Sequence, residues 1–339
     1  MHTRRAAAVA VTLLAAISAV ASPVAAGDNR ITVETSPRDF ARFGSAALPP
    51  SLTFLGGIEL QHDGENFGGF SGLDVSPDGR SFLSVSDRGH WLRGDFVYRD
   101  GKLAGVSNVE MAPIRNAAGE VDARKSRSDA EAVAAWSADG IAGKVIVGFE
   151  RRERVEQFDL GKHGLDAPAE PVRLPKAASE GESNGEIEAL GRFGEGPLKG
   201  WLIAISERNE TADGELRGWL WRKGRTHEFH ITRLEDYRVT GLAILPGGEE
   251  IITVERSFTP PIRVGMAMRR FKVADLEKPK AGAGKRVFEG KIHAWKIDNM
   301  EGIAAHADER GTIITVISDD NFNRSIQDTV MFQFRLDLD

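Results

Sequence analysis

The chain has 339 residues, of which 41% are hydrophobic and 28% are charged, a balance typical of a globular protein with a large core. Its formal net charge is −6, and removal of two arginines with a cleaved leader would leave about −8, which argues against nucleic acid as a partner. Cysteine is absent, which excludes disulfides, thiol nucleophiles and thiolate zinc sites.

The first residues have the pattern of an export signal. Arg4 and Arg5 precede an apolar stretch, and small residues follow up to Ala26. The stretch is too short for a membrane anchor, and no later apolar run approaches about 18 residues. We therefore expect residues 1–26 to be removed by the general or the twin-arginine route. Residues 27–339 are then expected to form a single domain, a periplasmic or secreted monomer with no membrane span.

Five later segments share one plan. Each has a polar residue, a small residue, an aliphatic residue, a glycine-containing turn, a β-branched run and then an acidic residue; they span residues 70–89, 128–152, 184–209, 239–257 and 299–321. Such runs around glycine turns predict hairpins, and further strand-like stretches lie between them. About four strands in each 50 to 60 residues is typical of a propeller blade. The sequence predicts an all-β protein, a β-propeller with five blades; a sixth would arise if residues 28–67 formed more sheet.

The last unit is short of strands. After its hairpin it supplies only the run MFQFRLDL, residues 331–338. An N-terminal strand such as LTFLGGIEL, residues 52–60, is expected to complete its sheet and close the ring.

Polar residues occupy matching positions in the five units. The first strands open with Ser71, Glu131, Glu188, Thr240 and Glu301, and the second strands close with Asp87, Glu150, Glu207, Glu255 and Asp319. In an antiparallel hairpin the start of one strand lies beside the end of the other, so each opening residue is expected near its closing acid. Repetition around an axis then gathers these pairs on one face.

Three of the opening residues are doubled. Asp129, Glu186 and Asn299 each stand two residues before an opening glutamate, so both side chains of a pair lie on one strand face. Carboxylates gathered in this way repel one another unless some are protonated or a cation binds. Hard oxygen ligands suit Ca²⁺ or another divalent cation. The candidate metal ligands are Asp129, Glu131, Glu150, Glu186, Glu188, Glu207, Asn299, Glu301, Asp319 and Asp320.

Four arginines directly follow a closing acid: Arg88, Arg151, Arg208 and Arg256. With Asp87 they are candidates for binding a small anionic ester, because guanidinium groups bind phosphate through two hydrogen bonds. The alternative is that these arginines pair with acids of neighbouring blades, and that the acids serve only as structural partners or structural calcium ligands.

At these motifs the sequence resembles a bacterial family described as the esterase-like activity of phytase. The matching elements, within residues 54–338, are GGFSGLDVSPDGRSFLSVSDRG, SDAEAVA with FER, NGEIEAL with SER, and DNMEGIAA followed by ISDDNF. The resemblance implies a phytase-like propeller that hydrolyses phosphate esters or related esters. By analogy with propeller phytases, the carboxylates would bind calcium, with Glu188, Glu301 and Asp319 as catalytic residues, and the arginines would contact phosphate. No cluster of lysines lies at this rim, which argues against phytate itself.

Three functions fit these features. The first is a calcium-dependent phosphoesterase. The second is a lactonase-like or carboxyl-ester hydrolase built on the same scaffold. The third is a non-catalytic ligand-binding propeller whose metal only stabilises the fold, and the fold alone does not choose among them.

Overall fold

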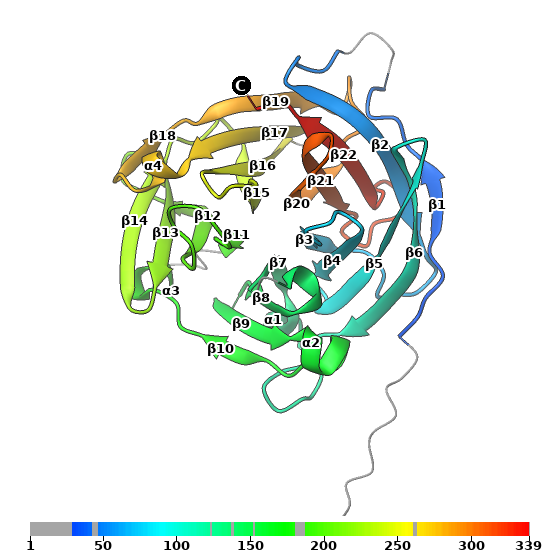
Figure 1. The fold of residues 1–339 in the computed structure, drawn as a ribbon, viewed down its shortest axis with the longest axis horizontal. Coiled ribbons are helices and arrows are strands. Elements are labelled where there is room, and N and C mark those ends of the chain that lie inside the picture. Colours follow the sequence, from blue (N-terminus) through cyan, green and yellow to red (C-terminus); the bar gives the residue numbers. More distant parts are fainter. Residues whose placement is uncertain are drawn as a thin grey trace, which may run out of the picture.

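The computed structural model describes residues 29–42, 47–122, 124–136, 139–151, 153–179, 187–259 and 263–338. Five sheets stand around one axis as the blades of a propeller (Figure 1). Helix is limited there to single turns: α1 (Lys125–Ser128), α2 (Leu160–His163), α3 (Lys176–Ser179), α4 (Val273–Leu276) and the 3-10 turns η1 (Gly140–Ala142) and η2 (Gly164–Asp166). No described helix is long and apolar enough to cross a membrane. The predicted all-β propeller with five blades is confirmed.

Each repeat unit supplies the inner strands of one blade. Blade 1 contains β3 (Phe70–Val75), β4 (Ser81–Ser86), β5 (His90–Arg99) and β6 (Lys102–Pro113). Blade 2 contains β7 (Ala130–Ala135), β8 (Lys144–Phe149), β9 (Arg154–Asp159) and β10 (Glu170–Val172). Blade 3 contains β11 (Ile187–Arg192), β12 (Leu202–Glu210), β13 (Leu216–Arg222) and β14 (Arg225–Ile231), and β18 (Lys280–Gly282) joins its edge from the fourth unit. Blade 4 contains β15 (Arg238–Ile244), β16 (Glu250–Thr259), β17 (Arg263–Lys272) and β19 (Lys285–Lys291).

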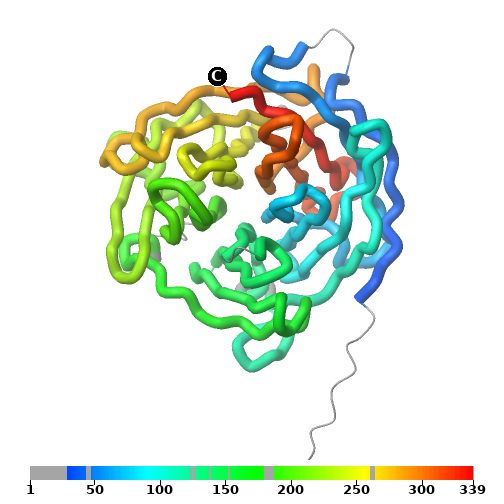
Figure 2. Tube along the Cα trace, in the orientation of Figure 1, coloured from blue at the N-terminus to red at the C-terminus, as the bar shows by residue number. Residues whose placement is uncertain are grey.

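Blade 5 joins the two ends of the chain. Its inner strands are β20 (Asn299–Asp308), β21 (Gly311–Asp319) and β22 (Val330–Leu336), and its outer strands are β2 (Leu52–Gln61) and β1 (Glu34–Pro37). β2 pairs with β22 from Leu52 opposite Leu336 to Glu59 opposite Val330, as the sequence predicts. Figure 2 shows the N-terminal segment in blue against the C-terminal strand in red. Of the described residues before 67, β1 and β2 complete blade 5 and Asn29–Ile31 pair with β6 of blade 1, so these described residues form no sixth blade.

The hydrophobic core consists of five layers, one between each pair of neighbouring blades. The layer between blades 2 and 3, for example, joins Ile146 and Val155 to Leu202 and Trp219. The other four layers have the same arrangement. The β-branched second strands are buried on both faces because each blade packs against two neighbours, which explains why their apolar runs are continuous.

A ring of small residues lines the axis. Gly72, Ala132, Ala189, Gly241 and Gly302 follow the opening residues of the five inner strands. A Cβ atom on Gly241 would lie 2.4 Å from the carbonyl oxygen of Glu301, and one on Gly302 would lie 2.9 Å from the carbonyl oxygen of Ser71. The inner strands thus approach one another backbone to backbone. The cavity left at this level is only about 10 Å³, so the ring almost closes the channel.

Deletion of residues 27–60 is expected to remove cooperative folding. Leu52, Ile58 and Leu60 are at most 3% exposed, and burial of such side chains contributes about 1.5–3 kcal/mol each, against a net stability of about 5–15 kcal/mol. Thermal melting checks this result, with a chain beginning at Asn29 as the control. Equal melting temperatures would contradict the closure by β2.

Gly241→Ala is expected to destabilise the fold by about 1–3 kcal/mol, because the added methyl group meets backbone that cannot move freely. Gly194→Ala is the matched control, since its Cβ would meet no described atom within 4 Å. Urea unfolding measures both free energies. Equal stability of the two variants would mean that the axis has more room than these contacts indicate.

Candidate functional site

The opening residue of every inner strand is the extra residue of a β-bulge. In blade 2, Ala130 pairs with Phe149 and Ala132 pairs with Gly148, which leaves Glu131 without a partner in the ladder. The same shift occurs at Ser71, Glu188, Thr240 and Glu301. A bulge re-aims its side chain, and all five side chains are buried. The bulges therefore produce a ring of polar side chains next to the small residues of the axis.

The closing positions form a second ring. Because of the bulge, the partner of the closing residue in blades 1, 2 and 5 stands two places before the opening residue. Asn299 pairs with Asp319, and the amide of Glu150 donates to the carbonyl oxygen of Asp129 at 2.9 Å. In four blades an acid occupies this second ring: Asp87, Glu150, Glu207 and Asp319.

The fourth blade differs from the expected pattern. Glu255 pairs with Val239, so it stands one residue too early for the second ring, and Arg256, opposite Arg238, takes that position. Neighbouring residues of a strand point to opposite faces, so Glu255 lies inside the blade. Its two carboxylate oxygens accept from Arg269 at 2.6 and 3.0 Å. Glu255 is therefore a structural partner of Arg269 and is not part of the ring.

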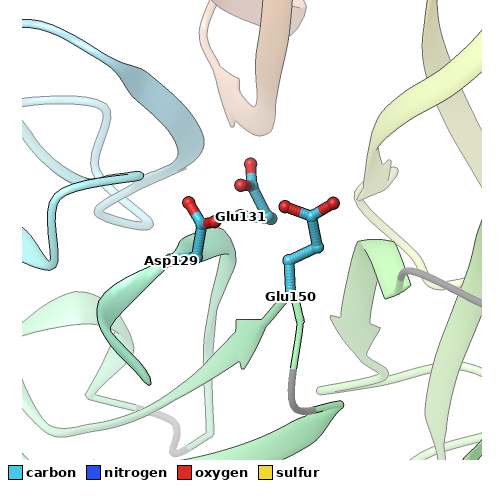
Figure 3. Close-up of side chains that lie close together, drawn as sticks. All are labelled: Asp129, Glu131 and Glu150. Carbon is cyan, nitrogen blue, oxygen red and sulfur yellow. The ribbon is translucent and has the colours of Figure 1, made fainter. Parts of the chain in front are cut away.

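Three carboxylates from blade 2 lie close together. Asp129, Glu131 and Glu150 each offer an oxygen within 4.8 Å of the other two. Figure 3 shows the three side chains turned toward one another, with Glu131 between the other two. Asp129 is 1% exposed and Glu131 is 7% exposed. We call these three residues the acid trio.

The charge of the acid trio is only partly balanced. Asp129 accepts a hydrogen bond from Arg151, whose own side chain is 48% exposed. Burial raises the pKa of Glu131 well above its usual range, and the charges of Glu301, Asp129 and Glu150 raise that pKa further. The hydroxyl of Ser71 hydrogen-bonds both Glu131 and Glu301 and opposes this effect. Ionised Glu131 is thus disfavoured unless a cation lies beside it.

Burial and charge repulsion also raise the pKa of carboxylates in the neighbouring blades. Burial is the largest cause of the raised pKa of Glu188, followed by the charges of Glu131 and Glu207. Burial and the charge of Glu301 also raise the pKa of Asp319. Glu301 has a raised pKa as well, although Arg256 lowers it. These carboxylates act on one another electrostatically across three blades.

The donor chemistry of the acid trio fits a hard divalent cation. Carboxylate oxygens are the preferred ligands of Ca²⁺, which tolerates variable geometry. A bound cation would also remove the repulsion that raises the pKa of Glu131. Asp129, Glu131 and Glu150 are therefore the residues that would hold a metal ion. The charges of Glu131 and Glu150 also raise the pKa of Glu188.

Other predicted metal ligands have different partners. Asn299 donates to Glu301 at 2.8 Å and to Asp319 at 3.3 Å. Asp320 accepts from the amides of Gly69 and Phe322 at 2.9 and 3.0 Å, so it fixes two loops. Glu186 lies outside the described residues.

The four predicted anion-binding arginines fall into two groups. Arg88 donates to the carbonyl oxygen of Glu65 and stacks on a phenyl ring, Arg151 pairs with Asp129, and Arg208 donates to Glu207 at 2.6 Å. Arg208 is 58% exposed. Arg256 pairs with acids of both neighbouring blades, Glu207 and Glu301, which is the alternative left open by the sequence.

The other end of the channel is a separate cavity of about 470 Å³. Its walls are aliphatic, with Leu73, Val133 and Ile303 among them, and they include Asp74. Burial raises the pKa of Asp74 to about 6, although the amides of Ala135 and Val75 donate to it. This cavity could not be predicted from the sequence, because most of its lining residues have the pattern of ordinary strand interior.

Similarity to known proteins supports a family assignment. No curated protein sequence matches the chain. Solved structures that match the chain at low similarity include Kuenenia stuttgartiensis hydrazine synthase (14% identity, 76% of this chain and 57% of that chain, TM-score 0.36), U3-55K (9%, 85% and 99%, 0.39) and the N-terminal domain of Nup159 (10%, 86% and 97%, 0.37). These likenesses are too distant to bear on function. The family pattern described as the esterase-like activity of phytase matches residues 65–322, which include all five hairpins and the acid trio, and the chain belongs to this phytase-like family.

Proposed function

We propose that the chain is an exported phytase-like hydrolase, a Ca²⁺-dependent phosphoesterase that acts on a small anionic ester. The observation that carries the proposal is the acid trio, three carboxylates of one blade within 4.8 Å of one another. Membership of a family described by esterase-like and phytase activity supports the hydrolytic reaction. The placement of Glu131, Glu188 and Glu301 at the bulges of three blades supports a site rather than a chance surface cluster.

The acid trio would bind the cation, and the rest of the ring would act around it. When bound, a divalent cation polarises a phosphoryl oxygen and lowers the pKa of a coordinated water. Burial, the largest cause of its raised pKa, favours the protonated form of Glu188. Glu188 would therefore hold a proton beside the trio and exchange it with the attacking water or the leaving group.

Two exposed arginines stand beside the acids. Arg151 is bound to Asp129, and Arg208 is bound to Glu207. Each guanidinium is about half exposed, so each retains a side that faces solvent. These sides would bind the oxygens of an anionic ester and orient it toward the trio. Arg88, which stacks on Phe322, would contribute less.

Glu131→Gln is expected to raise the melting temperature in chelator and to abolish the response to calcium. The substitution removes a buried, repelled charge and also a metal ligand. Calcium at about 100 times its dissociation constant would stabilise the unmodified protein by roughly 2.7 kcal/mol, on the order of 5 °C. Glu309→Gln, at the far end of the inner hairpin of blade 5, is the control because Glu309 is exposed. Absence of calcium binding at millimolar concentration would exclude the metal site.

The pH dependence of stability in chelator has a defined sign. The pKa of Glu131 is raised above the value of 4.5 that is expected in the unfolded chain. The folded state therefore binds the proton more tightly, and stability falls as the pH rises from about 4.5 through the raised pKa. Glu131→Gln should reduce this fall. Unfolding in urea between pH 4.5 and 8 measures the difference, and identical slopes would contradict the raised pKa.

Phosphate release from p-nitrophenyl phosphate is expected in calcium and is expected to be lost in chelator. Glu131→Gln should lower kcat/KM by at least about 100-fold, because a metal ligand is removed. The activity should fractionate with the periplasm or the medium. Chelator-sensitive opening of a lactone or cleavage of a carboxyl ester, without phosphate release, would replace the phosphoesterase with the second hydrolase. Calcium-dependent melting without turnover on any ester would indicate a binding propeller.

A further inference from the structure

The fourth blade contributes no carboxylate to either ring. Its bulge residue is Thr240, whose hydroxyl donates to the carbonyl oxygen of Met300 in blade 5 at 3.0 Å. Its closing position holds Arg256, where the other blades hold an acid. A cationic side chain thus takes the place of an anionic one at a single blade.

Arg256 binds acids on both sides of its own blade. Its guanidinium lies 3.6 Å from Glu207 of blade 3 and 3.4 Å from Glu301 of blade 5, and it donates to the amide oxygen of Asn299 at 2.6 Å. The Arg256 side chain is 28% exposed, and the two carboxylates are nearly buried. The charges of Glu301 and Glu207 raise the pKa of Arg256 against the effect of burial.

The oxygens around Arg256 match those of the acid trio in kind. Both sets contain two carboxylates from an opening and a closing position and one polar side chain from the position opposite a closing residue. In the trio that third residue is Asp129, and around Arg256 it is Asn299. The second set differs because it surrounds a cation of the chain itself, the guanidinium of Arg256.

We propose that Arg256 is a resident cation that takes the place of a second divalent ion and limits the ring to one metal site, at the acid trio. The guanidinium neutralises Glu207 and Glu301 permanently, whereas the trio requires an ion from solution. The inference rests on the proposed function for the metal site at the acid trio. The contacts of Arg256 with Glu207 and Glu301 do not depend on that proposal. Removal of the Arg256 charge then takes the shared cation away from Glu207, Glu301 and Asn299 and leaves Glu207 paired with the exposed Arg208. Ca²⁺ would take the place of the guanidinium between these hard oxygen donors.

Calorimetric titration of chelator-stripped protein with calcium chloride tests the proposal. The unmodified protein is expected to bind one ion and Arg256→Ala two. Arg256→Lys, which retains the charge, should bind one. Arg208→Ala is the matched control, because Arg208 also pairs with Glu207 but is exposed. This variant should still bind one calcium ion. Melting in chelator should be lower for Arg256→Ala than for Arg208→Ala, and calcium should restore it.

The outcomes separate this proposal from the proposed function. One ion in both the unmodified protein and Arg256→Ala would overturn the resident cation and leave the trio site intact. No ion in the unmodified protein and one in Arg256→Ala would support the resident cation and overturn the trio site. Two ions in the unmodified protein would overturn the resident cation. If Arg256→Ala does not fold, Arg256→Gln with the same titration gives the same decision, since it also removes the charge but keeps more of the side chain.

Discussion

The close approach of five inner strands at the axis is the constraint on which the site depends. Gly241 and Gly302 allow backbone contact between neighbouring blades, and the residue before each of them is the extra residue of a β-bulge. The bulge at that residue turns the side chain into the ring. The same geometry that closes the channel therefore gathers polar side chains at one end of it. The packing of the five blades sets the distances between these side chains.

Such a ring is electrostatically costly, and the protein reduces the cost in three ways. Neutral hydroxyls stand at two of the five bulges, at Ser71 and Thr240, and Ser71 hydrogen-bonds two glutamates. Exposed arginines pair with the acids at the rim. Arg256 pairs with them from within the ring. In the acid trio, Arg151 pairs with Asp129, and burial and repulsion still raise the pKa of Glu131. A buried charge that is not balanced within the chain favours binding of an ion.

Much of the fold could be predicted from the sequence because its signals are local and repeated. Glycine turns and β-branched runs define the hairpins, and the shortage of strands in the last unit indicates that β2 must pair with β22. The exact register could not be predicted, because a bulge adds one residue without changing the hydrophobic pattern. Glu255 was expected in the ring because, like the closing acids of blades 1 to 3, it follows an apolar run and precedes an arginine. Its strand pairing places it one residue earlier, and Arg256 occupies the ring position. The crossing of β18 into blade 3 had no signal either, since its pairing covers only a few residues.

The charges of the ring also explain why a nearly five-fold scaffold would have a reaction centre away from its axis. If all five blades carried acids, a cation would be attracted equally from every side. Blade 4 instead presents Arg256 and Thr240, which repel a cation or leave it unbound, and blade 2 presents three carboxylates. The attraction is therefore strongest beside blade 2, where Arg151 is exposed and bound to Asp129. In the proposed function, an anionic ester that contacts Arg151 would meet the cation at that point, so the same asymmetry would place the metal and set the side from which the substrate approaches.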